Sequence, residues 1–155
     1  MGKALSRSPL APEHFPTLPV IGGVRFATVA AGVRYSGRTD VMLAVMDPGT
    51  SVAGVFTRSA TRSAPVLDCQ AKLGSDTGSA AAILVNSGNS NAFTGHYGQT
   101  SVKELTGALA GMTGIPNERI FTASTGVIGE PLPHDRIIAK LEQLNGDLSA
   151  SAAEA

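Results

Sequence analysis

Two short apolar runs without polar alternation limit the fold of this chain most strongly. Val41–Met46 reads VMLAVM, and Ala80–Val85 reads AAAILV. A strand with one solvated face alternates apolar and polar residues, whereas a strand buried on both faces stays apolar along its length. Both runs therefore predict buried strands, and Ala80–Val85 is typical of a central strand in a sheet.

The segments around these runs contain further strand and turn signals. Gly23–Gly37 mixes Val and Phe with small residues, which predicts a strand, a turn and a second strand. The tripeptide Asp47–Gly49 reads DPG, a strong turn signal. Ser51–Ala60 contains several β-branched residues and is predicted to return as the second strand of a hairpin. Glu118–Ser124 is predicted as a later strand.

Two helices are predicted in the second half of the chain. Ser101 and Glu104 have the spacing of a capping box, in which each side chain bonds the backbone N–H of the other residue. The first helix is accordingly predicted over Val102–Thr113, and Gly114 suits the position just after its end. The second helix is predicted over Pro133–Gly146. Strands that alternate with helices predict an α/β fold.

The length of 155 residues is that of one ordinary domain. Residues 1–20 contain four prolines, which disfavour a helix, so this segment is predicted to be an extended N-terminal arm. Residues 21–155 are predicted to form one domain without an internal linker. No apolar run approaches the roughly 20 residues that a membrane-spanning helix needs.

The charge composition narrows the classes of partner. Twelve basic and twelve acidic residues give a net charge of zero, without the basic patch typical of nucleic-acid or anionic-membrane binding. Charged residues make up 15%, below the roughly 25% of soluble domains, which indicates surface that faces another protein. A small domain with a neutral polar surface is the open alternative. Cys69 is the only cysteine, which favours a reducing compartment such as the cytoplasm.

The triplet Ser124–Gly126, at the end of the later strand, has two interpretations. Acyl transfer passes through a tetrahedral intermediate with an oxyanion, which the site must stabilise with hydrogen-bond donors. The Thr125 hydroxyl and the Gly126 N–H are suitable donors, and glycine permits unusual dihedral angles and close approach. On spacing alone, a simple strand end is the more common structure for such a triplet.

Other candidate sites have weaker signals. Cys69 could pair with His96 or His134 as nucleophile and base, but a lone thiol is usually a core residue. The histidines lack the spacing of a metal site. The glycine-rich loop Gly88–Gly98 precedes a helix and could hold a phosphate, but it lacks the lysine of a phosphate-binding loop. Asn86–Asn91 could orient a polar substrate or satisfy the backbone of a tight turn, and composition favours the turn.

Two motifs together resemble one enzyme family. VNSGNSNAFTG at Val85–Gly95 and STGVIGEPLP at Ser124–Pro133 are similar to segments of the ornithine acetyltransferases, also called arginine-biosynthesis bifunctional glutamate N-acetyltransferases. Further similar segments lie at Ala30–Val45, Ala53–Thr57 and Ala64–Cys69. The resemblance extends in order from about Ile21 to the C-terminus. Ser90 departs from the family pattern, which commonly has Ala there.

This resemblance implies an αββα sandwich of mixed sheets flanked by helices. It implies acetyl transfer from N2-acetyl-L-ornithine to L-glutamate, with acetyl-CoA as a further acetyl donor in some members and without a metal or prosthetic group. The family's precursor cleaves itself before a threonine, giving α and β chains that assemble as a heterotetramer of two α and two β chains. The new N-terminal threonine of the β chain is the nucleophile, and the oxyanion-hole pair falls on Thr125 and Gly126.

The sequence ends at Ala155, before the family's cleavage site and its nucleophilic threonine. We therefore expect the N-terminal part of an α chain, which carries the oxyanion hole and is inactive alone. One alternative is a truncated or split-gene relic that acts as a non-catalytic interaction piece. Another is a related self-cleaving hydrolase of similar fold, such as an aminopeptidase, although the NSGNSNAFTG motif argues against it.

Overall fold

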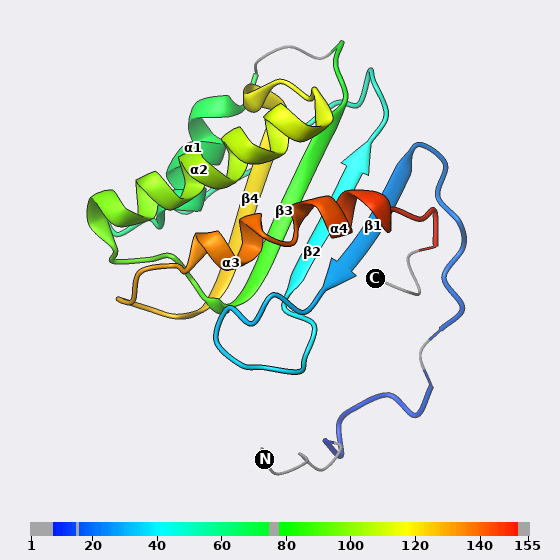
Figure 1. Cartoon of the computed structure of the whole chain (residues 1–155), viewed down its shortest axis with the longest axis horizontal. Helices are drawn as coiled ribbons and strands as arrows, with labels where there is room; N and C mark the ends of the chain where they lie inside the picture. The colour runs from blue at the N-terminus through cyan, green and yellow to red at the C-terminus, as the bar shows by residue number, and fades with distance from the viewer. Residues whose placement is uncertain (1–7, 15, 75–77, 152–155) are drawn as a thin grey trace.

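The computed structural model describes residues 8–14, 16–74 and 78–151, which are organised by a mixed four-stranded sheet (Figure 1). The strands, in their order across the sheet, are β1 (Val24–Val29), β2 (Val41–Met46), β3 (Ala81–Asn89) and β4 (Ile120–Val127). The pairs β1–β2 and β2–β3 are antiparallel, whereas β3–β4 is parallel. A parallel pair needs a crossover connection, and the helix α2 (Gly95–Thr113) supplies it.

Helices α2, α3 (His134–Ile138) and α4 (Leu141–Gly146) lie across one face of the sheet (Figure 1). Their apolar side chains meet those of the strands in one core, in which Leu43, Leu109 and Leu144 are fully buried. Complete burial of such a side chain contributes about 1.5–3 kcal/mol to the free energy of folding. This core fixes the strands whose ends carry the candidate site.

The backbones of both outer strands have hydrogen-bond partners beyond the sheet itself. Helix α1 (Ala64–Lys72) lies against β4, where the side chains of Cys69 and Lys72 donate hydrogen bonds to β4 carbonyl oxygens at 3.4 and 3.0 Å. At β1, Phe26 and Ser149 exchange two backbone hydrogen bonds of 2.7 and 2.9 Å. The sheet is therefore held at each edge by a segment distant in sequence.

The predicted α/β class and both buried strands are confirmed. β2 occupies Val41–Met46, with four of its six residues buried, and β3 includes the predicted central run. However, β3 continues to Asn89, through residues that were predicted to form a turn. The described residues form one mixed sheet flanked by helices; the second sheet that the αββα resemblance implies is not found among them.

Two predicted strands are wrong. Ser51–Ala60 has no strand, because β2 is already paired with β1 on one side and β3 on the other. The second strand in Gly23–Gly37 is a loop, because the Asp40 carboxylate accepts hydrogen bonds from backbone N–H groups of that segment. Helix α1 carried no clear sequence signal and was not predicted.

The helix boundaries also differ from the prediction. α2 begins at Gly95, so Ser101 lies inside the helix and donates its hydroxyl to the Tyr97 carbonyl at 2.9 Å instead of capping the helix. The extra N-terminal turns are supported by Asn91, whose side chain donates to the Gly98 carbonyl at 3.1 Å. Gly114 ends α2 at φ +72°, as predicted. The second predicted helix is divided into α3 and α4.

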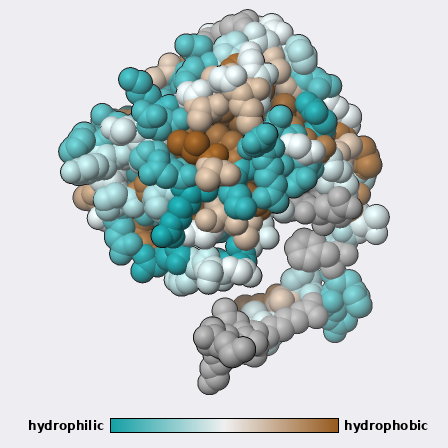
Figure 2. All heavy atoms as spheres, viewed as in Figure 1, coloured by the Kyte–Doolittle hydropathy of each residue, from teal (hydrophilic) through white to brown (hydrophobic). Residues whose placement is uncertain are grey.

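Exposed apolar side chains are present on the helix-bearing face, between polar regions (Figure 2). The exposed large apolar residues include Val55, Phe93 and Ile128, with exposed fractions of 99%, 69% and 63%. Such exposure is consistent with the low charge content, which indicates surface that faces another protein. Within the described residues, no helix is long and apolar enough to cross a membrane. The assignment of residues 1–20 as a separate arm stays a prediction, and residues 1–7 and 15 lie outside the described part.

We expect Gly107→Ala and Gly111→Ala to raise the free energy of unfolding by about 0.5–1 kcal/mol each. Both glycines are exposed within α2, and an added Cβ would meet nothing within 4 Å. Alanine restricts the unfolded chain more than glycine does, which favours the helix. Urea denaturation followed by circular dichroism measures the change. Gly114→Ala is the control and should destabilise the chain, because Gly114 has φ +72°.

Candidate functional site

The structure brings the two predicted donor residues beside the asparagine-rich motif. In the parallel pair β3–β4, Ser87 lies opposite Thr125 and Gly88 lies opposite Gly126. All four residues are at the carboxyl ends of their strands, the edge at which open α/β sheets bind ligands. The motifs 85–95 and 124–133 thus lie side by side, at the paired carboxyl ends of β3 and β4.

Gly126 occupies a position that only glycine can fill. Its φ is +133°, and an added Cβ would lie 2.4 Å from the Gly88 carbonyl carbon and 2.6 Å from the Asn89 nitrogen. These are backbone atoms that cannot move aside as a flexible side chain could. The strand register also shifts at Gly88 and Asn89, so the two chains meet in an irregular, close contact. This contact fixes the backbone at the predicted oxyanion hole.

Thr125 and its neighbour Ser124 have different surroundings. The Ser124 hydroxyl donates a 2.6 Å hydrogen bond to the Asn86 side-chain oxygen. Thr125 is exposed, and its hydroxyl bonds no described residue. The side chains of consecutive strand residues point to opposite faces of the sheet. The Ser124 hydroxyl is therefore used in a structural hydrogen bond, whereas the Thr125 hydroxyl is left as a free donor. The oxyanion-stabilising role of Thr125 and Gly126 stays a prediction that this arrangement permits.

A shallow hollow of about 440 Å³ opens beside the two donor residues. It is lined by Arg34, Tyr35, Arg38, Ser87, Gly88, Thr125, Gly126 and Val127. The three residues of the 34–38 segment come from the β1–β2 loop and were not predicted as part of a site. They lie within Ala30–Val45, one of the segments that resemble the family, but the resemblance assigned them no role, and only the folded loop brings them to β4.

The asparagine cluster satisfies backbone groups, as composition favoured. Asn86 donates its side-chain N–H to the Asn89 carbonyl at 2.9 Å, and Asn89 donates to the Glu130 carbonyl at 3.0 Å. The Asn91 N–H donates to the Asn89 side-chain oxygen at 2.7 Å. All three asparagines are buried. Because an unpaired buried polar group is costly, this network holds the 86–91 segment in one conformation against the segment around Glu130.

The weaker candidates do not form a catalytic group. Cys69 is buried against β4, and burial raises the pKa of its thiol, so a reactive thiolate is disfavoured. His134 bonds Ser101 at 3.1 Å rather than Cys69. Among the described residues, no cluster of His, Cys, Asp and Glu is arranged to hold a metal ion.

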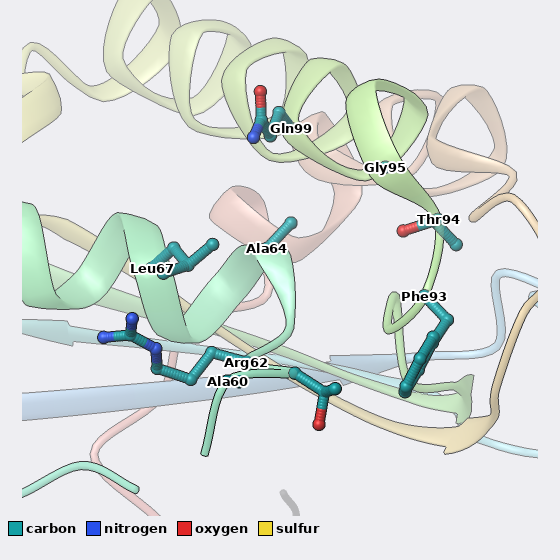
Figure 3. Close-up of a pocket in the computed structure, with 9 residues that line it drawn as sticks. Ala60, Arg62, Ala64, Leu67, Phe93, Thr94, Gly95 and Gln99 are labelled. Atoms are coloured by element: carbon teal, nitrogen blue, oxygen red, sulfur yellow. The ribbon is translucent and has the colours of Figure 1, made fainter. Parts of the chain in front are cut away.

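A second hollow, of about 280 Å³, lies between the N-terminal ends of α1 and α2. Leu67 of α1 and Gln99 of α2 line it, and Phe93 lies at its other end (Figure 3). The Arg62 guanidinium extends away from Phe93 and donates to the Gln70 side chain at 3.0 Å. Phe93 has φ +56°, an uncommon conformation for a residue with a side chain. The residue is 69% exposed. Phe93–Gly95 belong to the loop Gly88–Gly98 that was a weak phosphate-site candidate, whereas neither Thr125 nor Gly126 lines this hollow.

Comparisons with known proteins agree with the resemblance. Residues 25–155 of this chain match the sequence model of the ArgJ family. The chain is 73% identical over 154 residues to the arginine biosynthesis bifunctional protein ArgJ of Ruegeria pomeroyi, covering 99% of this chain and 38% of that protein. The ArgJ of Bradyrhizobium diazoefficiens is 53% identical over 152 residues, covering 95% and 36%. The chain thus spans little more than a third of the length of these relatives.

Two solved structures share the fold. The ArgJ of Bacillus halodurans has a TM-score of 0.76 at 30% identity, covering 86% of this chain and 69% of that chain. The ornithine acetyltransferase of Mycobacterium tuberculosis, solved in complex with ornithine, has a TM-score of 0.73 at 34% identity, covering 86% and 73%.

We expect Gly126→Ala to lower the free energy of unfolding by about 3 kcal/mol or more, since it adds both backbone strain and a clash with β3. Denaturant titration of the purified variant measures this loss. Gly129→Ala is the matched control: Gly129 has φ +85° but open space around its Cβ position. It should lose only about 1–2 kcal/mol. Equal losses in the two variants would contradict the close-contact explanation.

Proposed function

The chain belongs to the ArgJ family, and on that premise we propose that it forms the oxyanion-stabilising part of a glutamate N-acetyltransferase in arginine biosynthesis. The relatives that it matches are named arginine biosynthesis bifunctional proteins. Membership of the ArgJ family argues against the alternative of an aminopeptidase-like hydrolase. The observation that carries the proposal is the juxtaposition of Thr125 and Gly126 at the open carboxyl edge of β4.

In the proposed reaction, the threonine hydroxyl of a β chain attacks the acetyl carbonyl carbon of N2-acetyl-L-ornithine. The carbonyl oxygen becomes an oxyanion, which accepts hydrogen bonds from the Thr125 hydroxyl and the Gly126 N–H. The amide C–N bond then breaks, ornithine leaves with a proton on its amine, and an acetyl-threonine ester remains. The α-amine of L-glutamate attacks this ester, which releases N-acetylglutamate and restores the threonine.

The structure of the donor pair suits this role. The backbone contact of Gly126 with β3 keeps its N–H in place, so the site needs little reorganisation as charge develops. The Thr125 hydroxyl is exposed to the hollow rather than used in a structural bond. A preorganised pair of this kind stabilises the transition state more than the neutral ground-state carbonyl.

Further parts of the proposal concern the complete enzyme. Its partner is a β chain that carries the nucleophilic threonine, in a heterotetramer of two α and two β chains formed by autocatalytic cleavage. Acetyl-CoA is a second acetyl donor, and no metal or prosthetic group takes part. The complete enzyme acts in the cytoplasm. The relative that was solved with ornithine is consistent with an amino-acid substrate of this type.

A chimaera tests the role of Thr125. This chain replaces the matching segment of the Ruegeria pomeroyi relative, to which it is 73% identical. We expect Thr125→Ala to lower kcat for acetyl transfer by about 10²–10³-fold with a smaller effect on KM, because one oxyanion donor is lost. Ser124→Ala is the control, since that hydroxyl bonds Asn86, and it should leave kcat within a few-fold. An unchanged kcat in Thr125→Ala would refute the assignment.

The isolated 155-residue chain should form no N-acetylglutamate from acetylornithine and glutamate, because the proposed nucleophile lies on another chain. Mass spectrometry of the reaction mixture measures the product directly. Product formed by the isolated chain contradicts the division of the site between two chains. An inactive but folded chimaera instead favours the alternative of a non-catalytic interaction piece.

A further inference from the structure

The β1–β2 loop brings two guanidinium groups to the hollow that contains the donor pair. Arg34 and Arg38 line this hollow together with Thr125 and Gly126. The loop follows β1 directly and returns to β2 at Val41, so both arginines are attached to strands of the sheet through short connections. The hollow therefore has a neutral donor end at β4 and a positively charged side at the loop.

The loop has a fixed conformation. Asp40 is buried, and its two carboxylate oxygens accept the Ala31 N–H at 2.7 Å and the Val33 N–H at 2.6 Å. Arg136 of α3 donates to the Gly32 carbonyl at 2.6 Å. The loop also touches β3: an ideal Cβ added at Gly88 would lie 3.1 Å from the Arg34 Cβ. These contacts hold the loop at residues 31–34 and at Asp40, on either side of Arg38, and so limit where Arg38 lies relative to β4.

Arg34 and Arg38 differ in the interactions that their guanidinium groups make. Arg34 forms an ion pair of 2.6 Å with Glu130, and hydrogen bonding with Tyr35 and then with Glu130 raises its pKa. The Arg38 guanidinium lies 5.0 Å from the centroid of the Tyr35 ring, and it makes no hydrogen bond or ion pair with the described residues. Stacking on the ring orients the guanidinium and leaves its N–H groups free to bind an anion.

We propose that Arg38, oriented by Tyr35, binds the side-chain carboxylate of the acyl acceptor and so selects a dicarboxylic amino acid. The inference rests on the proposed function, which places the acyl carbon at Thr125 and Gly126. When the α-amine of the acceptor attacks there, its side chain extends away from the donor pair into the remainder of the hollow. A guanidinium is the group that best matches a carboxylate, because both are planar and form two parallel hydrogen bonds.

The ion pair between Arg34 and Glu130 also bears on the binding of the acetyl donor, N2-acetyl-L-ornithine. Acetylornithine carries an ammonium group at the end of its side chain, which Arg38 repels and Glu130 attracts. The rim of the hollow thus presents both signs of charge, with Arg34 and Glu130 neutralising each other in the free protein. Replacement of Arg38 should therefore affect the dicarboxylic acceptor and the amine-bearing donor in opposite directions.

Nuclear magnetic resonance of the ¹⁵N-labelled 155-residue chain tests this proposal. L-glutamate should shift the amide signals of Gly88, Thr125 and Gly126, and Arg38→Gln should raise its Kd about fivefold, as expected for loss of a partly exposed ion pair. The Kd for N2-acetyl-L-ornithine should fall. Arg58→Gln is the matched control, since Arg58 is exposed outside the hollow and the variant has the same net charge.

Each outcome of the titration bears on one proposal. If acetylornithine shifts the Thr125 and Gly126 signals while Arg38→Gln leaves glutamate binding unchanged, the subsite is wrong and the proposed function stands. If glutamate shifts signals only outside the hollow, the subsite is also wrong. If neither substrate shifts the Thr125 and Gly126 signals, the placement of the acyl carbon there is contradicted as well. Inorganic phosphate is a further probe, and binding tighter than that of glutamate overturns the carboxylate assignment.

Discussion

The close contact between the backbones of Gly88 and Gly126 is the constraint on which the rest of the site depends. Two parallel strands normally keep the separation set by their hydrogen bonds, with side chains above and below. Here the absence of a Cβ on Gly126 allows β4 to approach the β3 backbone in a way that any other residue would prevent. Gly88 also admits the Arg34 side chain, so the loop, β3 and β4 are layered at one point. The hollow and the donor pair both result from this layering.

Buried polar groups maintain the layering from either side. On the loop side, Asp40 satisfies two backbone N–H groups that lack strand partners. On the helix side, Asn86, Asn89 and Asn91 bond backbone atoms around the strand ends. Such groups contribute little net free energy when they are paired, but they exclude alternative conformations because any rearrangement leaves a buried group unpaired. A site rich in polar groups is therefore compatible with a rigid backbone.

The sequence predicts the parts of this architecture that depend on local patterns. The apolar runs of β2 and β3 and the end of α2 at Gly114 follow from periodicity and from glycine chemistry, and the motif resemblance located Thr125 and Gly126. The β1–β2 loop and the start of α2 were missed, because the side chains of Asp40 and Asn91 bond backbone groups beyond the reach of local turn and capping patterns. The strand predicted at Ser51–Ala60 was also wrong because of contacts that no local pattern shows. Its residues have adequate β propensity, but β2 already pairs with β1 on one side and with β3 on the other. Arg38 lies in the similar segment Ala30–Val45, but no pattern assigned it a role, since its surroundings arise only from the folded loop.

The two edges of the sheet have a consequence for how this chain behaves among its own copies. Exposed edge strands offer unpaired backbone groups to other molecules and promote association through added strands. In this chain Ser149 occupies the middle of β1, and side chains of α1 occupy carbonyl oxygens of β4. The backbone of Phe26 and two carbonyl oxygens of β4 are thus already engaged, which shortens the free stretch at each edge. Protection of this kind favours a chain that stays dispersed at high concentration until a specific partner surface covers its exposed apolar residues.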